Sequence, residues 1–108
     1  MSNLQINKNK ISSTVLKNHA VSGTTGDIDF IMENLFPNQS FLYCKLIDYA
    51  LGLVSSEEGR NRIRYYLFNG SSIQRNYAAL YFKRLGHSRV IQEAVKGGAI
   101  DEIQGYSR

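Results

Sequence analysis

Residues 71–86, with the sequence SSIQRNYAALYFKRLG, carry the clearest structural signal in the chain. Ser71 and Gln74 have the spacing of a capping box, in which a hydroxyl and an amide satisfy free backbone N–H groups at a helix start. One broad arc of the following helix is apolar, and it consists of Ile73, Tyr77, Ala78, Leu80, Tyr81, Phe82 and Leu85. Gly86 then ends the helix. The segment therefore predicts a largely buried helix.

The neighbouring segments repeat this plan. Residues 88–96 predict a shorter helix that Ser88 caps and that two glycines end. Upstream, residues 41–54 are apolar around nearly the whole circumference, which is typical of a helix packed on two sides. Ser55 and Glu58 then give a second capping-box spacing before the next helix. We therefore expect two antiparallel helix pairs, offset by roughly 30 residues, which is in the range of helical repeats.

The sequence IQRNYAALYFKRLGHSRVIQEAVKGG, residues 73–98, resembles a HEAT-like helical repeat of the PBS-lyase type. In that family the first helix carries an arginine and an alanine-rich stretch before Leu-Gly, and the second is rich in valine, isoleucine and alanine. The matching positions are Arg75, Ala78, Ala79, Leu85, Gly86, Val90, Ile91, Ala94 and Val95. The resemblance, over residues 41–98, implies an all-α fold of two stacked helix pairs and a binding role. It implies no catalytic residues, because the family has no shared chemistry.

The two ends of the chain complete the expected architecture. Residues 1–24 are rich in Asn, Ser and Lys, and they predict a polar, partly flexible arm with a short helix near residues 12–17. Residues 25–108 are expected to form a single all-helical domain. In it, short helices before Pro37 and within residues 99–106 would cap the two ends of the stack. Such caps, or a homodimer, would cover the faces that two repeat units leave exposed.

Composition is that of an ordinary globular domain. The 108 residues are 43% hydrophobic and 20% charged, which excludes wholesale disorder. No run approaches the roughly 20 apolar residues of a membrane span, so we expect no membrane association and a cytoplasmic location. The single cysteine, Cys44, lies in an apolar helix and has no disulfide partner in the chain, which predicts a buried structural thiol.

Positive charge is concentrated in residues 55–96, where eight Lys or Arg stand against three Glu, a net charge of +5 in a chain of net charge +4. The predicted partner-binding residues are Arg60, Arg64, Tyr65, Phe68, Arg75 and Lys83. A basic and aromatic helical face suits an acidic protein partner, which we favour, and the alternative is the phosphates of a nucleic acid. A solvated surface that only confers solubility would have the same charge pattern.

Catalytic and metal-binding patterns are missing from the sequence. His19 and His87 lie far apart, and neither has Cys, His or acidic neighbours at ligand spacing. We therefore expect no enzyme, no metal and no cofactor. A helix-turn-helix reader of DNA is disfavoured, because Phe82 stands where that motif normally has a small residue. The expected function is non-enzymatic binding of a macromolecule, as an adaptor in protein–protein interaction.

Overall fold

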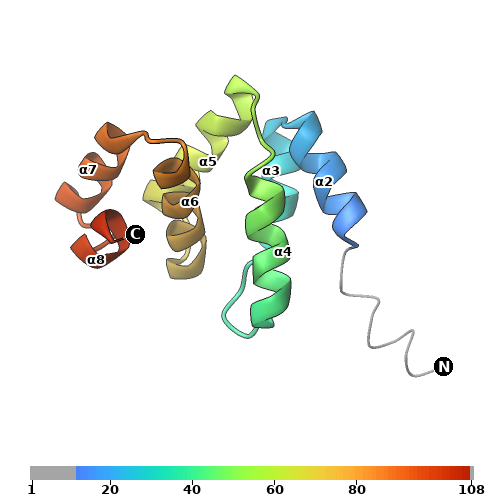
Figure 1. The fold of residues 1–108 in the computed structure, drawn as a ribbon, viewed down its shortest axis with the longest axis horizontal. Helices are drawn as coiled ribbons and strands as arrows, with labels where there is room; N and C mark the ends of the chain where they lie inside the picture. Colours follow the sequence, from blue (N-terminus) through green and yellow to red (C-terminus); the bar gives the residue numbers. More distant parts are fainter. Residues whose placement is uncertain (1–11, 108) are drawn as a thin grey trace.

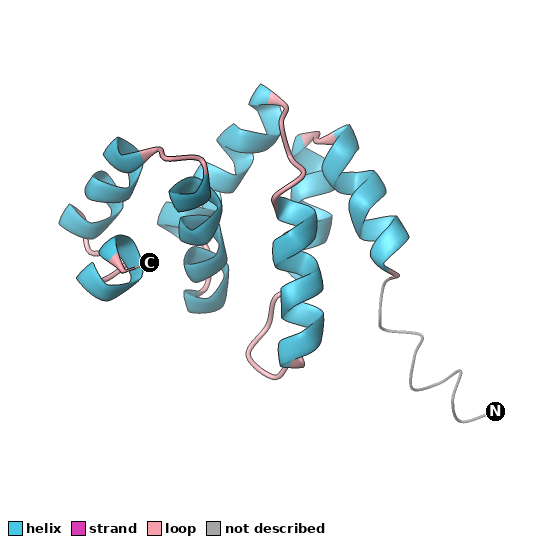
Figure 2. Cartoon of the chain, in the orientation of Figure 1, coloured by secondary structure: helices cyan, strands magenta, loops and turns pink. Residues whose placement is uncertain are grey.

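The computed structural model describes residues 12–107, and in this range all regular structure is helical (Figure 1, Figure 2). The helices are α2 (Ser13–Ser22), α3 (Thr25–Glu33), α4 (Phe41–Leu51), α5 (Glu57–Asn69), α6 (Ser72–Arg84), α7 (Ser88–Lys96) and α8 (Glu102–Tyr106). The expected all-α class is therefore confirmed for the described part of the chain. The prediction for residues 1–11 of the polar arm lies outside the described residues.

The helices are stacked side by side in two rows. α2, α4 and α6 stand in the front row of Figure 1, and α3 and α5 lie behind them. α5 packs against α3 on one side and against α6 on the other, whereas α4 packs mainly against α2 and more lightly against α6. α7 packs on α6, and the short α8 covers the C-terminal end against both. Side-by-side helix packing is thus observed, with α6 and α7 in contact as expected, whereas α4 and α5, the expected first pair, are not close neighbours.

One hydrophobic core runs through the stack. Its largest fully buried side chains are Leu16, Ile28, Ile31, Met32, Ile47, Leu51, Ile63, Leu67 and Tyr81. The hydroxyl of Tyr81 donates to the carbonyl oxygen of Val54 at 2.7 Å, so the phenol is buried without an unpaired polar atom. Cys44 is buried, as predicted, and this burial raises the pKa of its thiol. The polar atoms of the core are therefore satisfied or weakly polar.

Helix α2 belongs to the helical body. Leu16 and Ala20, one turn apart, are completely buried in the core that α2 shares with α3 and α4. The Oγ of Ser12 accepts the Val15 N–H and starts the helix. Residues 13–22, expected within the polar arm, are thus a packed helix that extends beyond the short one predicted near residues 12–17. Two buried positions are too few to give a recognisable apolar face in the sequence.

The start of α6 follows the sequence prediction and the start of α7 does not. Ser71 Oγ accepts the Gln74 N–H at 3.3 Å, and Gln74 Oε1 accepts the Ser71 N–H at 2.9 Å, so the predicted capping box is confirmed. The predicted cap by Ser88 is wrong, because Ser88 is the first helical residue of α7. His87 occupies the cap position and makes no side-chain cap bond.

The start of α5 is displaced by one residue from the prediction. Ser56, and not Ser55, caps the helix by accepting the Gly59 N–H at 3.0 Å. Glu58 does not return to the cap, because its Oε2 accepts the backbone N–H of Thr25 in α3 at 2.8 Å. Tertiary contact with α3 therefore replaces the local box that the spacing suggested.

Helix α4 leaves one apolar face exposed, although its apolar circumference suggested packing on two sides. Its buried residues are Tyr43, Cys44, Ile47, Ala50 and Leu51. The opposite face is solvent-exposed, with exposed fractions of 70% for Phe41, 75% for Leu42, 42% for Leu46 and 59% for Tyr49. Helices α2 and α6 both pack against α4 and leave this face uncovered. The apolar circumference therefore overstates how much of α4 is buried.

Gly59 lies where the chain has no room for a side chain. A Cβ at this position would lie 2.6 Å from Val54 Cγ1 and 2.7 Å from Ser56 Oγ, below contact distance. Gly59→Ala should therefore lower the free energy of unfolding by about 1–3 kcal/mol. Gly26→Ala is the matched control in the first turn of α3, where the nearest atom would be 3.9 Å away, and it should stabilise by at most about 1 kcal/mol. Urea denaturation measures both; equal stabilities would contradict the close approach.

Candidate functional site

An open groove between α5 and α7 contains two of the predicted partner-binding residues. Arg60 and Arg64 lie one turn apart on α5, so both are on the side of that helix that borders the groove. The groove has a volume of about 500 Å³, and its other wall comes from α7 and the preceding turn, with His87, Arg89 and Glu93. Arg89 is a third arginine that the sequence analysis did not place in the site.

Three guanidinium groups and one carboxylate line the groove, which leaves it with a net charge of +2. Arg64 Nη2 lies 2.9 Å from Glu93 Oε1, and both side chains are 49% exposed. An exposed pair of this kind contributes roughly 0–1 kcal/mol, so a carboxylate from a partner can replace Glu93 at little cost. Arg60 Nη1 donates to the Ser55 carbonyl at 2.8 Å. Within residues 12–107 no hydrogen bond or ion pair holds the side chain of Arg89.

The α7 side of the groove combines an aromatic pair with a helix start. His87 stacks on Phe82 with ring centroids 5.8 Å apart, and both residues line the groove. The first backbone N–H groups of α7 have no side-chain cap, and they add a positive partial charge at the same wall. The groove is therefore suited to an anionic group with apolar atoms beside it.

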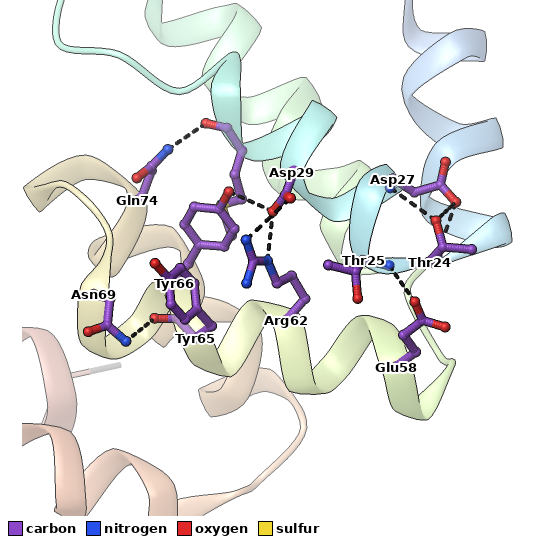
Figure 3. A network of polar contacts seen from close by, with 11 residues as sticks. Thr24, Thr25, Asp27, Asp29, Glu58, Arg62, Tyr65, Tyr66, Asn69 and Gln74 are labelled. Atoms are coloured by element: carbon purple, nitrogen blue, oxygen red, sulfur yellow. Dashed lines mark hydrogen bonds and ion pairs between the residues drawn. The ribbon is translucent and has the colours of Figure 1, made fainter.

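Tyr65 and Phe68 lie outside this groove. Tyr65 is on the α3 side of α5, where the guanidinium of Arg62 lies 4.2 Å from its ring centroid (Figure 3). Phe68 is half-buried at the edge of the core, and the guanidinium of Arg64 lies 5.2 Å from its ring centroid. Phe68 is thus next to the groove through Arg64, whereas Tyr65 belongs to another surface of α5.

Arg75 and Lys83 are bonded to carbonyl groups at the C-terminal end of the stack. Arg75 Nε donates to the Ala99 carbonyl at 2.7 Å. Lys83 Nζ donates to the carbonyl oxygens of Gln104 and Ser107, at 2.7 and 2.9 Å. These carbonyls belong to or follow the last two helices, so both cations satisfy backbone acceptors and hold α8 against α6. Their charges are already engaged inside the chain.

The structure therefore brings together Arg60 and Arg64, with Phe68 beside them, and places the other three predicted residues elsewhere. Sequence reasoning missed the contribution of α7. A local signal for it exists, since Arg89 and Glu93 are four residues apart and so share one side of that helix. This side of α7 borders α5 only in the tertiary structure, and the spacing of residues within α7 cannot predict it.

A polar cluster of Asp29, Arg62 and Tyr66 sets the orientation of α5 against α3 (Figure 3). Asp29 Oδ1 accepts from Arg62 Nε at 2.7 Å and from the Tyr66 hydroxyl at 2.8 Å. The hydrogen bond from Arg62 is the main cause that lowers the pKa of Asp29, and it outweighs the opposing effect of burial. Burial, together with the bond to Asp29, raises the pKa of Tyr66 to about 12. The cluster thus stabilises ionised Asp29 and neutral Tyr66.

The lowered pKa of Asp29 predicts how stability responds to acid. Its stabilising contribution is present above the ordinary carboxyl pKa of 3.8 and is lost as pH falls toward the lower folded-state pKa. Asp29→Asn should cost about 1–3 kcal/mol near pH 7 and flatten the acid-side loss of stability. Urea denaturation between about pH 2.5 and pH 7 tests this. Glu33→Gln, at the exposed end of the same helix, is the control, and an identical acid limb in the two variants would contradict the role of the cluster.

Within residues 12–107, no helix is both long and apolar enough to cross a membrane. The same range holds no three His, Cys, Asp or Glu side chains grouped as a metal site requires. Comparison with models of known protein families, with curated proteins and with solved structures finds no match to the chain. The geometry of the groove and the surface charges are therefore the features that bear on function.

Proposed function

We propose that the protein is a non-enzymatic binding module that takes an acidic segment of a partner protein into the groove between α5 and α7. The observation that carries this proposal is the lining of the groove, where Arg60, Arg64 and Arg89 face one carboxylate, that of Glu93. Guanidinium groups bind carboxylates through paired, charge-assisted hydrogen bonds. A segment with two or three acidic side chains would displace Glu93 from Arg64 and pair with Arg89 as well.

The distribution of charge favours an acidic peptide over a nucleic acid. A nucleic acid presents phosphates along its whole length and is bound best by a continuous track of cations. Here the arginines of α5 are preceded by Glu57 and Glu58 in the first turn of the same helix, and Glu93 lies inside the groove. The positive region is therefore short. It matches a few carboxylates more closely than a phosphate backbone.

The helical scaffold supports the same proposal. Stacked helix pairs present ridges and grooves between neighbouring helices, and repeat proteins of this construction act mainly by binding other macromolecules. The resemblance of residues 73–98 to a HEAT-like repeat agrees with such a role. In this proposal the partner binds in the arginine groove, between α5 and α7.

Neutralising two exposed groove arginines should weaken the binding of an acidic probe. A fluorescent peptide of alternating Glu and Gly, about 12 residues long, contains no apolar side chain and reports on charge alone. Arg64→Gln with Arg89→Gln should weaken its binding by at least about tenfold in fluorescence anisotropy, which corresponds to about 1.4 kcal/mol. Lys96→Glu is the charge-matched control, because it lowers the net charge by the same two units at an exposed position outside the groove and outside helix α4.

Two results would contradict the proposal. The first is equal affinity of the groove variant and the charge-matched control for the peptide, since the binding would then reflect net charge only. The second is tighter binding of a DNA duplex of about 20 base pairs, with an affinity that falls steeply and linearly in a plot of log K against log salt. That outcome would assign the groove to nucleic acid.

A further inference from the structure

The exposed face of α4 forms an apolar stripe that no other helix of the described chain covers. Phe41, Leu42, Leu46 and Tyr49 are separated by one, four and three residues, which places them on one side of a helix. Their exposed fractions are 70%, 75%, 42% and 59%. The stripe spans two helical turns, about 12 Å at 1.5 Å per residue. Large apolar side chains gathered in this way on a soluble fold are a sign of an interaction surface.

The stripe continues into a groove beside α6. Tyr49 and Lys45 of α4 line this groove together with Leu53 and with Arg84 of α6, and its volume is about 400 Å³. Tyr49 belongs both to the stripe and to this groove, so the two are continuous. An apolar ridge along a helix with a groove beside it has the shape that receives a second helix.

The charges around the stripe are positive and available. Lys45 Nζ lies 5.2 Å from the ring centroid of Phe41, and Lys17 Nζ lies 5.7 Å from that of Tyr49. Neither lysine is bonded to a carboxylate within residues 12–107. Asp48, the acid closest in sequence, is already paired with Arg84 at 2.8 Å. The apolar stripe is thus bordered by two lysines that contact its aromatic rings and pair with no carboxylate of residues 12–107.

We propose that this surface, the α4 stripe with Lys17 and Lys45, binds an amphipathic helix of a partner protein that carries acidic residues beside its apolar face. Phe41, Leu42, Leu46 and Tyr49 would pack against the apolar face, and the two lysines would pair with the acids. The surface shares no residue with the arginine groove between α5 and α7. It is therefore a second binding site, independent of the function proposed above.

Charge distinguishes this occupant from a second copy of the chain. In a two-fold dimer built on α4, each residue faces its own counterpart or a neighbour of it. Lys45 is near the middle of α4, so the two Lys45 ammonium groups would approach each other across the axis. Like charges in an apolar contact are unfavourable, whereas an acidic partner helix meets both lysines with opposite charge.

The test uses two synthetic helices of roughly 18 residues, long enough to fold on the surface. Both carry the same leucine stripe, and its flanking positions are Glu in one peptide and Lys in the other. The full-length protein should bind the Glu-flanked peptide at least about tenfold more tightly than the Lys-flanked peptide in fluorescence anisotropy. Lys17→Glu with Lys45→Glu should invert this preference, which a merely structural role of the lysines would not produce.

The apolar contribution is tested with exposed positions, so that folding is preserved. Phe41→Gln with Leu42→Gln should weaken binding of the Glu-flanked peptide by at least about tenfold. The matched control is Ile103→Gln with Tyr106→Gln, which removes two apolar side chains of 76% and 57% exposure from α8; it should change the affinity by less than about twofold. Circular dichroism checks that all variants are folded.

Three outcomes would overturn the proposal. One is equal binding of the Glu-flanked and Lys-flanked peptides, and another is equal affinity of the Phe41/Leu42 variant and its control. The third is a dimer in sedimentation that Phe41→Gln with Leu42→Gln dissociates, which would assign the stripe to a second copy. Arg64→Gln with Arg89→Gln should leave the binding of the Glu-flanked peptide within about twofold, so failure of the arginine-groove proposal is measured separately.

Discussion

The polar contact between α3 and α5 is centred on one carboxylate, that of Asp29. Helix α5 lies between α3 and α6, yet most of its residues are polar, and its largest fully buried side chains are Ile63 and Leu67. Asp29 accepts hydrogen bonds from Arg62 and Tyr66 of α5. Without these hydrogen bonds, packing of α3 would remove water from the polar groups of α5 and would not replace the hydrogen bonds lost to water. The charge-assisted bonds make a polar helix face compatible with a central position.

This contact also determines which side chains of α5 line the groove beside α7. With Arg62 and Tyr66 turned toward α3, residues two positions away along the helix lie on other sides. Arg60 and Arg64 consequently border α7, and Tyr65 stays with Arg62 (Figure 3). Several of the positive charges in residues 55–96 are likewise bonded within the chain. Arg62 and Arg84 pair with acids, and the cations of α6 that bind carbonyl groups hold α8 in place. A net charge of +5 in residues 55–96 thus overstates the positive charge available to a ligand.

Contacts within one helical turn could be predicted from the sequence, whereas contacts between helices could not. The capping box of Ser71 and Gln74 was predictable, because both partners lie within one helical turn and compete with nothing else. The box of Ser55 and Glu58 had the same spacing and was wrong, because Thr25 of another helix offered Glu58 a better-placed donor. For the same reason Arg60 and Arg64 could be placed together from their spacing, whereas the contribution of Arg89 could not.

The apolar circumference of α4 could not predict how much of the helix is buried, and this difference can be expressed as free energy. Sequence patterning reports how much apolar surface a helix offers, and it predicted the burial of Cys44 correctly. It does not report how many neighbours the fold supplies. A side chain such as Leu42 would gain roughly 1.5–3 kcal/mol from full burial. Its exposure in this chain therefore leaves that free energy unused in folding and available for association.

The two proposed surfaces differ in what they can contribute to a complex. The arginine groove holds exposed charges, whose attraction is screened beyond about 8 Å at physiological ionic strength and acts mainly on orientation and association rate. The α4 stripe offers apolar area, which is not screened and therefore governs how long a complex lasts. α4 and α5 both pack against α6, so the core fixes the distance between the surfaces. A partner with an acidic segment and an amphipathic helix would bind the second site intramolecularly, provided that its linker spans this fixed distance.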